Sequence, residues 1–241
     1  MSNLSYYEMR VEMSKVAKLM WERRLTNAAG GNFAVRVDEN RILISPSMMS
    51  EHRHCEMNPE DFLLIDYDEN ILEGTGKLSR EGKMHVLILS NFKNIGATIH
   101  AHPFYCMPFV AFSQPIPNVT EATMGRGYVE CIPWTKAYSE DLANNVYQYF
   151  EDRRELAERK PIGMIMPKHG VVVSGPTIYG AYSMLERIEA DAFCNLAKSV
   201  MWPDMPLPDN GGYPTKPKPS NLRLWAFNFS QEVFPHEICG I

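Results

Sequence analysis

The sequence Ala-Thr-Ile-His-Ala-His at residues 97–102 is an apolar run that ends in two histidines and is closed by Pro103. This composition predicts a buried β-strand, in which residues i and i+2 point to the same face. The imidazoles of His100 and His102 are therefore expected in one pocket, about 7 Å apart along the backbone. Imidazole is the commonest protein ligand for zinc, and three protein ligands with one open position are typical of catalytic zinc. A lone histidine would favour a hydrogen-bonded core residue, but this pair favours a metal site.

A third ligand is needed to complete such a site. His169 is the leading candidate, because Lys168-His169-Gly170 separates two apolar runs that are predicted to form a hairpin. A ring at that turn can point back toward the end of the sheet. Position alone leaves the choice open, and the weaker candidates lie in a charged loop, in a predicted helix and in the tail: His52, His54, His85 and His236.

Glu81 precedes the two histidines by about nineteen residues and lies near the start of a predicted helix over 79–92, with Ser79 as its N-cap. Two interpretations are open for this carboxylate. It can interact with the helix dipole, which is worth a few tenths of a kcal/mol. Close to a divalent cation, it can instead act as a displaceable ligand and then as a proton carrier.

The periodicity of the remaining sequence predicts one α/β domain over residues 1–201, a three-layer α/β/α arrangement with a mainly antiparallel central sheet. Helices are expected at 5–24, 79–92, 139–156 and 177–201. Strands are expected at 32–37, 41–45, 62–67, 97–102, 129–133, 162–166 and 170–174. Residues 202–241 form a Pro-rich and then aromatic C-terminal arm, which is expected to pack on this subunit or on a neighbour.

The composition excludes several classes of protein. Of the 241 residues, 45% are hydrophobic and 22% are charged, as in soluble globular proteins. No apolar run is long enough to span a membrane, and the N-terminus lacks a basic-then-apolar signal, so we expect a cytoplasmic protein without a membrane partner. A net charge of −5 without a basic block argues against nucleic-acid binding. The five scattered cysteines contain no C-x-x-C pair, which argues against a disulfide framework or a cysteine-built zinc site.

Several separated motifs, taken in order, resemble the class II aldolase/adducin-head family over roughly residues 5–200. The enzymes of this family include fuculose-1-phosphate and rhamnulose-1-phosphate aldolases. The matching segments are Ala-Gly-Gly-Asn-Phe-Ala-Val-Arg at 29–36, Ile-Ser-Pro-Ser at 44–47, Gly-Lys-Leu-Ser-Arg-Glu at 76–81, His-x-His at 100–102 and Lys-His-Gly at 168–170.

The resemblance implies that His100, His102 and His169 hold a divalent metal, most often Zn²⁺, with Mn²⁺ or Co²⁺ as alternatives. Glu81 would move between coordinating this metal and transferring a proton. The implied function is that of a metal-dependent aldolase, a lyase that cleaves or forms a C–C bond in a small ketose phosphate or related hydroxy-ketone through a metal-stabilised enediolate. The resemblance also implies a homotetramer.

Two alternatives remain on the same scaffold. One is a dehydratase, an epimerase or a decarboxylase of a sugar or sugar-acid phosphate. Epimerases of the family carry Asp at the position of Glu81, so the glutamate favours an aldolase. The other is a non-catalytic scaffold like the adducin heads. Those have lost the ligands, whereas the three histidines and the acid are all present here.

The family pattern places the substrate phosphate at positions that correspond to Gly31, Asn32, Ser47 and Ser79. The chain departs from this pattern at Ala29, Met48 and Arg80, where relatives carry a hydroxyl residue, a glycine and a serine. A guanidinium at position 80 can pair with a phosphate or hold a carboxylate through two hydrogen bonds. The phosphate is therefore an expectation, and an unphosphorylated hydroxy-keto acid is the alternative.

The sugar-phosphate aldolases place a tyrosine proton donor after a segment that corresponds to Ile116-Pro117. Here the segment reads Asn-Val-Thr-Glu-Ala-Thr, and Glu121 is the nearest acid. Glu121 is the first candidate for the proton donor, with a solvated loop position as the alternative interpretation. Tyr213 of the arm is the second candidate, and in the family such a group often comes from an adjacent subunit.

Overall fold

The computed structural model describes residues 4–126 and 128–207. Its α-helices are α1 Tyr7–Glu22, α2 Met49–Arg53, α3 Gly82–Asn91, α4 Met107–Ala111, α5 Glu140–Glu151, α6 Arg154–Ala157 and α7 Ile178–Met201, with a short 3-10 helix at Pro59–Asp61. Its strands are β1 Asn32–Arg36, β2 Arg41–Ile44, β3 Leu63–Asp66, β4 Ile71–Glu73, β5 Ala97–Ala101, β6 Glu130–Cys131, β7 Gly163–Met166 and β8 Gly170–Gly175.

The strands form one eight-stranded sheet in the order β4-β3-β2-β1-β5-β8-β7-β6. Neighbouring strands are antiparallel except for the pair β6 and β7, which is parallel. The expected mainly antiparallel sheet is therefore confirmed. Strand β5, which carries the first histidine of the His-x-His segment, lies near the middle of the sheet between β1 and β8.

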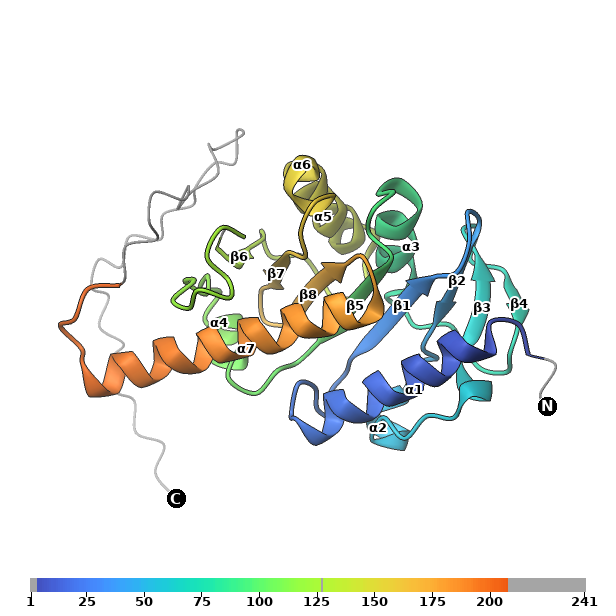
Figure 1. The fold of residues 1–241 in the computed structure, drawn as a ribbon, viewed down its shortest axis with the longest axis horizontal. Helices are drawn as coiled ribbons and strands as arrows, with labels where there is room; N and C mark the ends of the chain where they lie inside the picture. Colours follow the sequence, from blue (N-terminus) through green and yellow to red (C-terminus); the bar gives the residue numbers. More distant parts are fainter. Residues whose placement is uncertain (1–3, 127, 208–241) are drawn as a thin grey trace, which may run out of the picture.

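Helices cover both faces of the sheet, as Figure 1 shows: α1 and α7 lie on one face, and α3, α5 and α6 lie on the other. Two apolar clusters fill the two interfaces. The first joins the sheet to residues of α1 and α7, such as Met20 and Leu185. The second joins it to residues of α3 and α5, such as Ile88 and Phe150. The fold is thus the expected three-layer α/β/α arrangement. Within the described residues, no helix is both long and apolar enough to cross a bilayer.

Alternation along β1 and β5 decides which side chains face α3. Phe33 in β1 and Ile99 in β5 belong to the cluster under α1 and α7. Because successive strand residues point to opposite faces, Asn32, Thr98 and His100 point toward α3. The register pairs Asn32 with His100 across β1 and β5. Polar residues of two strands are thereby gathered at one end of the sheet, below the N-terminus of α3.

Three expected elements differ from the structure. The helix expected from Ser79 begins at Gly82, and Glu81 rather than Ser79 is at the N-cap position. The reason is that the Ser79 hydroxyl accepts a hydrogen bond from the Glu81 N–H, 3.3 Å long, in a turn that precedes the helix. The helix expected at 139–156 is two helices, α5 and α6, with the interruption at Asp152 and Arg153. The strand expected at 129–133 is reduced to the two residues of β6.

The other predicted helices and strands agree with the structure, except that part of the predicted C-terminal arm lies outside the described residues. The hairpin of β7 and β8 is present, with His169 in its turn, and the long last helix ends at Met201 as expected. Helices α2 and α4 and the edge strand β4 were not predicted, and each is only three to five residues long. Most of the C-terminal arm, including every aromatic residue after Trp202, lies beyond residue 207 and so outside the described residues.

Candidate metal site

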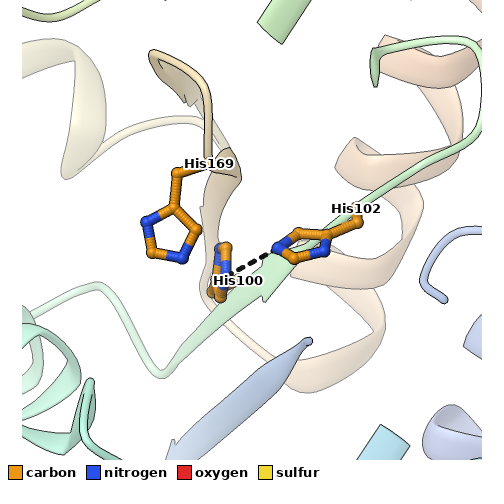
Figure 2. A group of neighbouring side chains, drawn as sticks. All are labelled: His100, His102 and His169. Carbon is orange, nitrogen blue, oxygen red and sulfur yellow. Dashed lines mark hydrogen bonds between the residues drawn. The ribbon is translucent and has the colours of Figure 1, made fainter. Parts of the chain in front are cut away.

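Three imidazoles converge at the end of β5. His100 and His102 come from this strand and the residue just after it, and His169 comes from the turn before β8 (Figure 2). One ring nitrogen from each histidine can be chosen so that all three lie within 4.8 Å of one another. His100 and His102 are buried, with exposed fractions of 1% and 5%, and His169 is partly buried. The structure therefore brings together the three histidines that were predicted as ligands.

The hydrogen bonds around His100 show which of its nitrogens can bind a cation. Its Nδ1 lies 3.0 Å from the carbonyl oxygen of Val171, and since a carbonyl only accepts, Nδ1 carries the proton. Nε2 then presents a lone pair, and it lies 3.2 Å from Nε2 of His102. Two ligand nitrogens around a tetrahedral Zn²⁺ are about 3.3 Å apart, given Zn–N bonds of about 2 Å. The donor set fits a divalent metal, and the Val171 carbonyl supplies the outer partner that orients a metal-binding histidine.

Two glycines allow the rings to pack closely against the backbone. A Cβ atom at Gly170 would lie 2.6 Å from Cδ2 of His102 and 2.7 Å from Cε1 of His100. A Cβ atom at Gly30 would lie 2.9 Å from Cε1 of His102. Side chains at these two positions would push the rings away from their common centre. The Gly-Gly loop and the Lys-His-Gly turn therefore shape the site, in addition to any contact they make with a substrate.

Glu81 lies next to the triad and is itself buried, with 6% exposed. Its Oε1 is 2.9 Å from Nε2 of His169, and its Oε2 is 3.4 Å from Nε2 of His100. Burial alone would raise the pKa of Glu81, but the positive charge that His100 and His169 carry when protonated and a hydrogen bond from Asn32 outweigh it and hold the pKa below its ordinary range. The carboxylate is therefore ionised at neutral pH and lies where it can contact a cation held by the three rings.

A pocket next to the triad is lined by the three segments that were expected to bind substrate. A bridge between Pro46 and Leu78 and a hydrogen bond from the Ser47 N–H to Lys77 O, 2.8 Å long, bring the second and third segments together. The lining residues are 28–32, 46–51 and 79–81 together with His100, Tyr138 and His169. Every residue predicted to bind substrate, from Gly31 to Arg80, thus borders one pocket that His100 and His169 of the triad also line.

The model of the class II aldolase and adducin N-terminal domain family matches residues 11–196. The chain belongs to this family. Among curated relatives, an L-fuculose phosphate aldolase of Methanococcus maripaludis is 31% identical over 185 residues, which cover 76% of this chain and 94% of the relative. A 3-oxo-tetronate 4-phosphate decarboxylase of Haemophilus influenzae is 26% identical over 200 residues, which cover 80% of this chain and 87% of the relative. Among solved structures, an L-fuculose 1-phosphate aldolase superposes with a TM-score of 0.70 at 24% identity, covering 87% of this chain and 94% of its own.

One departure from the family pattern is visible in the backbone. Met48 occupies the position at which the family carries a glycine, and it has a φ of 67°, in the left-handed region that favours glycine. The backbone here therefore has a conformation that a glycine adopts easily, although the residue is methionine. Met48 remains partly exposed at the pocket rim, so its side chain adds apolar surface where a glycine would leave the backbone open to a ligand.

Tyr138 is a pocket residue that the sequence did not identify. It follows β6 in a loop, has a left-handed φ of 63°, and its ring centroid lies 5.7 Å from that of His169. The guanidinium carbon of Arg80 lies 3.7 Å from the centre of the Tyr138 ring, in a cation–π contact. The arginine that departs from the family pattern is thus held at the rim by a tyrosine from a distant part of the chain.

Of the two candidates for the proton donor, only Glu121 lies in the described part of the chain, and it is not brought to the pocket. Glu121 is exposed in the loop before β6 and does not line the pocket. Tyr213 lies outside the described residues. Of the histidines considered as alternative ligands, His52 and His54 are exposed, His85 is buried in α3, and His236 lies outside the described residues.

The buried imidazoles predict a stability that falls in acid for the metal-free protein. Burial lowers the pKa of both His85 and His102 to about 3, whereas the ordinary pKa of an unfolded histidine is 6.5. Between these values the unfolded chain binds more protons, so the free energy of unfolding decreases as the pH falls, by at most about 1.4 kcal/mol per pH unit for each imidazole. Urea unfolding at a series of pH values should show a shallower slope for His85→Gln, and the exposed control His52→Gln should match the wild type. Equal slopes for the wild type and His85→Gln would contradict the expectation.

Proposed function

We propose that this protein is a metal-dependent aldolase that cleaves or forms a C–C bond in a small ketose phosphate or a related hydroxy-ketone. The observation that supports the proposal most strongly is the convergence of three imidazole nitrogens within 4.8 Å, with the ionised Glu81 beside them. A non-catalytic scaffold would have no need for a buried carboxylate next to three buried or half-buried histidines, because burying an ion is costly unless it is paired.

In the proposed reaction, His100, His102 and His169 hold a divalent cation, and Glu81 moves the proton. When bound, the metal supplies Lewis-acid chemistry that polarises a ketone and makes the neighbouring carbon acid easier to deprotonate. Glu81 accepts or returns a proton at Oε1, the oxygen that lies 2.9 Å from Nε2 of His169. The buried setting excludes bulk water, which strengthens each of these electrostatic interactions.

We propose that the anionic end of the substrate lies at the opposite rim of the pocket. Ser47, Ser79 and the backbone at Gly31 offer hydroxyl and N–H groups there, and Arg80 adds a positive charge. Gly31 has a φ of 130°, and a Cβ at this position would lie 2.5 Å from the Thr26 hydroxyl, so only glycine fits. A glycine-rich turn of this kind exposes backbone N–H groups to an anion.

The direct test is the identity of the products. Metal-loaded protein is incubated with a panel of ketose 1-phosphates, and the products are identified by mass. We expect dihydroxyacetone phosphate and an aldehyde from at least one of them, and the reverse condensation when the two products are mixed. Loss of CO₂, loss of water, or isomerisation without a change of mass would assign the protein to another reaction on the same scaffold. No turnover of any of these compounds would overturn the proposal.

A decarboxylase is the second candidate function. Arg80 can hold a carboxylate as well as a phosphate, and the chain is 26% identical to a protein named as a 3-oxo-tetronate 4-phosphate decarboxylase. The metal and Glu81 would serve this reaction too, since it also requires stabilisation of an enolate. Including 3-oxo acid phosphates in the panel and measuring released CO₂ separates this candidate from the aldolase.

Arg80→Met should weaken binding of a phosphorylated substrate. The change removes the charge and keeps most of the stem, so we expect KM to rise about fivefold to tenfold at low salt, from the loss of one exposed charge-assisted contact of about 1 kcal/mol. The effect should decrease at high ionic strength because the guanidinium is exposed. Arg159→Met, on an exposed arginine after α6, is the matched control. An unchanged KM for Arg80→Met in steady-state kinetics would exclude this role.

The remaining properties of the enzyme are proposed on the same basis. We propose Zn²⁺ as the native metal, with Mn²⁺ or Co²⁺ as substitutes, and a homotetramer located in the cytoplasm. Glu121 or Tyr213 would then be the proton donor, and Glu121 would have to come from an adjacent copy, since it does not line the pocket of its own chain. Neither a nucleic acid nor a membrane is expected as a partner.

A further inference from the structure

Four buried polar side chains form a continuous hydrogen-bonded chain that ends at the carboxylate of the active site. Thr98 Oγ1 lies 2.7 Å from Nδ1 of His85, and Nε2 of His85 lies 2.6 Å from Oδ1 of Asn32. Nδ2 of Asn32 then donates to Oε2 of Glu81 at 2.6 Å. The exposed fractions of these residues are 0% for Thr98 and His85 and 6% for Asn32 and Glu81. Water is therefore largely excluded as a competing partner.

The fold explains why these four residues meet. Asn32 and Thr98 stand on β1 and β5 and face α3 by strand alternation. Glu81 and His85 are four residues apart at the start of α3, a spacing that places both side chains on one face of the helix. The carboxylate of Glu81 and the imidazole of His85 therefore both contact polar side chains of β1 and β5.

The ionised carboxylate at one end of this row of hydrogen bonds determines which group donates and which accepts at every step. The ionised carboxylate of Glu81 can only accept, so the amide of Asn32 must turn Nδ2 toward it. Oδ1 of Asn32 then faces His85 and can only accept, so Nε2 of His85 carries the proton. Nδ1 of His85 is left with a lone pair, which accepts from the hydroxyl of Thr98. Both nitrogens of His85 are thus occupied, so it is not a metal ligand.

We propose that Thr98, His85 and Asn32 are positioning residues that hold Glu81 in one orientation, with Oε2 fixed by Asn32 and Oε1 left facing the histidine triad. In this arrangement His85 is a neutral, Nε2-protonated imidazole. Proton transfer by Glu81 therefore takes place at Oε1, an inference that rests on the proposed function. Burial lowers the pKa of His85 to about 3, which agrees with a permanently neutral ring.

The arrangement also assigns Asn32 a second task. Its side chain was expected to bind a substrate phosphate, but one N–H already points at Glu81 and its oxygen accepts from His85. Toward an anion, which only accepts hydrogen bonds, the remaining N–H is the one side-chain donor that Asn32 can still offer. The residue that touches the substrate is then also the residue that orients the carboxylate, so binding and proton transfer are coupled through one amide.

The tautomer of His85 is a test that does not depend on turnover. In ¹⁵N-histidine-labelled, metal-free protein, long-range ¹H–¹⁵N spectra report which ring nitrogen carries the proton, and the signals of His85 are assigned by their loss in His85→Gln. We expect a neutral ring protonated at Nε2 throughout pH 5.5 to 8. A ring protonated at Nδ1, a mixture of tautomers, or a cationic ring in this range would overturn the proposal.

Kinetics with paired variants test whether the hydrogen-bonded side chains hold Glu81 in the orientation that proton transfer needs. His85→Leu fills the space but cannot donate, and we expect kcat to fall by about 10-fold to 100-fold with KM within threefold of the wild type. His85→Gln should recover much of this loss, because its amide nitrogen can donate to Asn32. Ser90→Ala is the control, since the hydrogen bonds of this hydroxyl stay within α3: it donates to Val86 O and Leu87 O and accepts from Nδ2 of Asn91. Equal kcat values for the Leu and Gln variants would contradict the proposal.

A second pair keeps the test decisive if His85→Leu does not fold. Thr98→Val is nearly isosteric and removes only the hydroxyl, whereas Thr98→Ser retains it. We expect the serine variant to be close to the wild type and the valine variant to have a lower kcat, and the reverse order or equality would overturn the proposal. If no substrate is turned over at all, the aldolase assignment fails, and the ¹⁵N spectra alone then decide whether the hydrogen-bonded chain exists as described.

Discussion

His100→Ala is expected to lower kcat/KM for C–C cleavage by at least about 10³-fold, because the change removes a buried ligand and the metal contributes several kcal/mol to stabilising the transition state. The bound metal measured after dialysis should fall from about one per chain to a small fraction. His100 is a suitable position because the carbonyl of Val171 fixes its ring with Nε2 directed at the triad. His102→Ala should have a similar effect.

His52→Ala serves as the control for the loss of an imidazole, because His52 is exposed and does not border the pocket. It should retain both the metal and the activity. Assays of kcat/KM together with elemental analysis of the same preparations check the expectation. An His100→Ala protein that keeps wild-type activity would show that the three rings form a structural cluster without a part in catalysis.

Glu81→Gln is the second change with a large expected effect. The amide has nearly the shape of the carboxylate but cannot accept a proton, so kcat should fall by about 10²-fold to 10⁴-fold, the usual contribution of a positioned general base. The three histidines are unchanged, so the metal should remain bound. KM should change little, because Glu81 lies beside the triad rather than at the rim that is proposed to hold the anion.

The measurement is a steady-state comparison of Glu81→Gln and wild type at equal metal content. A neutral side chain at position 81 also changes the partner of Asn32, so Glu81→Asp is the companion variant. The aspartate keeps the charge and shortens the side chain, and it should retain more activity than the glutamine variant. Full retro-aldol activity in Glu81→Gln would remove Glu81 from the mechanism.

The parts of the site that follow local periodicity could be predicted from the sequence. The alternation of residues 97–102 places the first two histidines on one face, and the hairpin of β7 and β8 places His169 at their end. In each case a short run of residues determines both the element and the direction of the side chain. Their convergence depends on β5 and β8 being neighbours in the sheet, which the family resemblance supplied.

The parts of the site that depend on long-range contacts could not be predicted. Tyr138 follows a two-residue strand in an irregular loop, and its role depends on contacts with Arg80 and His169. His85 was considered as a ligand, yet its two nitrogens bond to Thr98 and Asn32. Partners so far apart along the chain leave no periodic signal in the sequence.

The errors in helix boundaries have a similar physical origin. Residues 152–156 contain neither proline nor glycine, so the pattern predicts that the helix continues through residue 156. In the structure Arg153 leaves the helical conformation, its guanidinium lies 4.0 Å from the Tyr149 ring centre, and it pairs with Glu130. Likewise the Ser79 hydroxyl, expected to cap a helix, contacts the backbone N–H of Glu81 in the turn that borders the pocket. Tertiary contacts override the local preference at both positions.

His100, His102 and His169 are proposed to bind one divalent cation in common. Diffraction from crystals of the protein loaded with Zn²⁺, recorded on both sides of the zinc absorption edge, tests this most directly. We expect one strong anomalous peak per chain about 2 Å from a nitrogen of each of the three rings. A peak elsewhere, or none at saturating Zn²⁺, would contradict it.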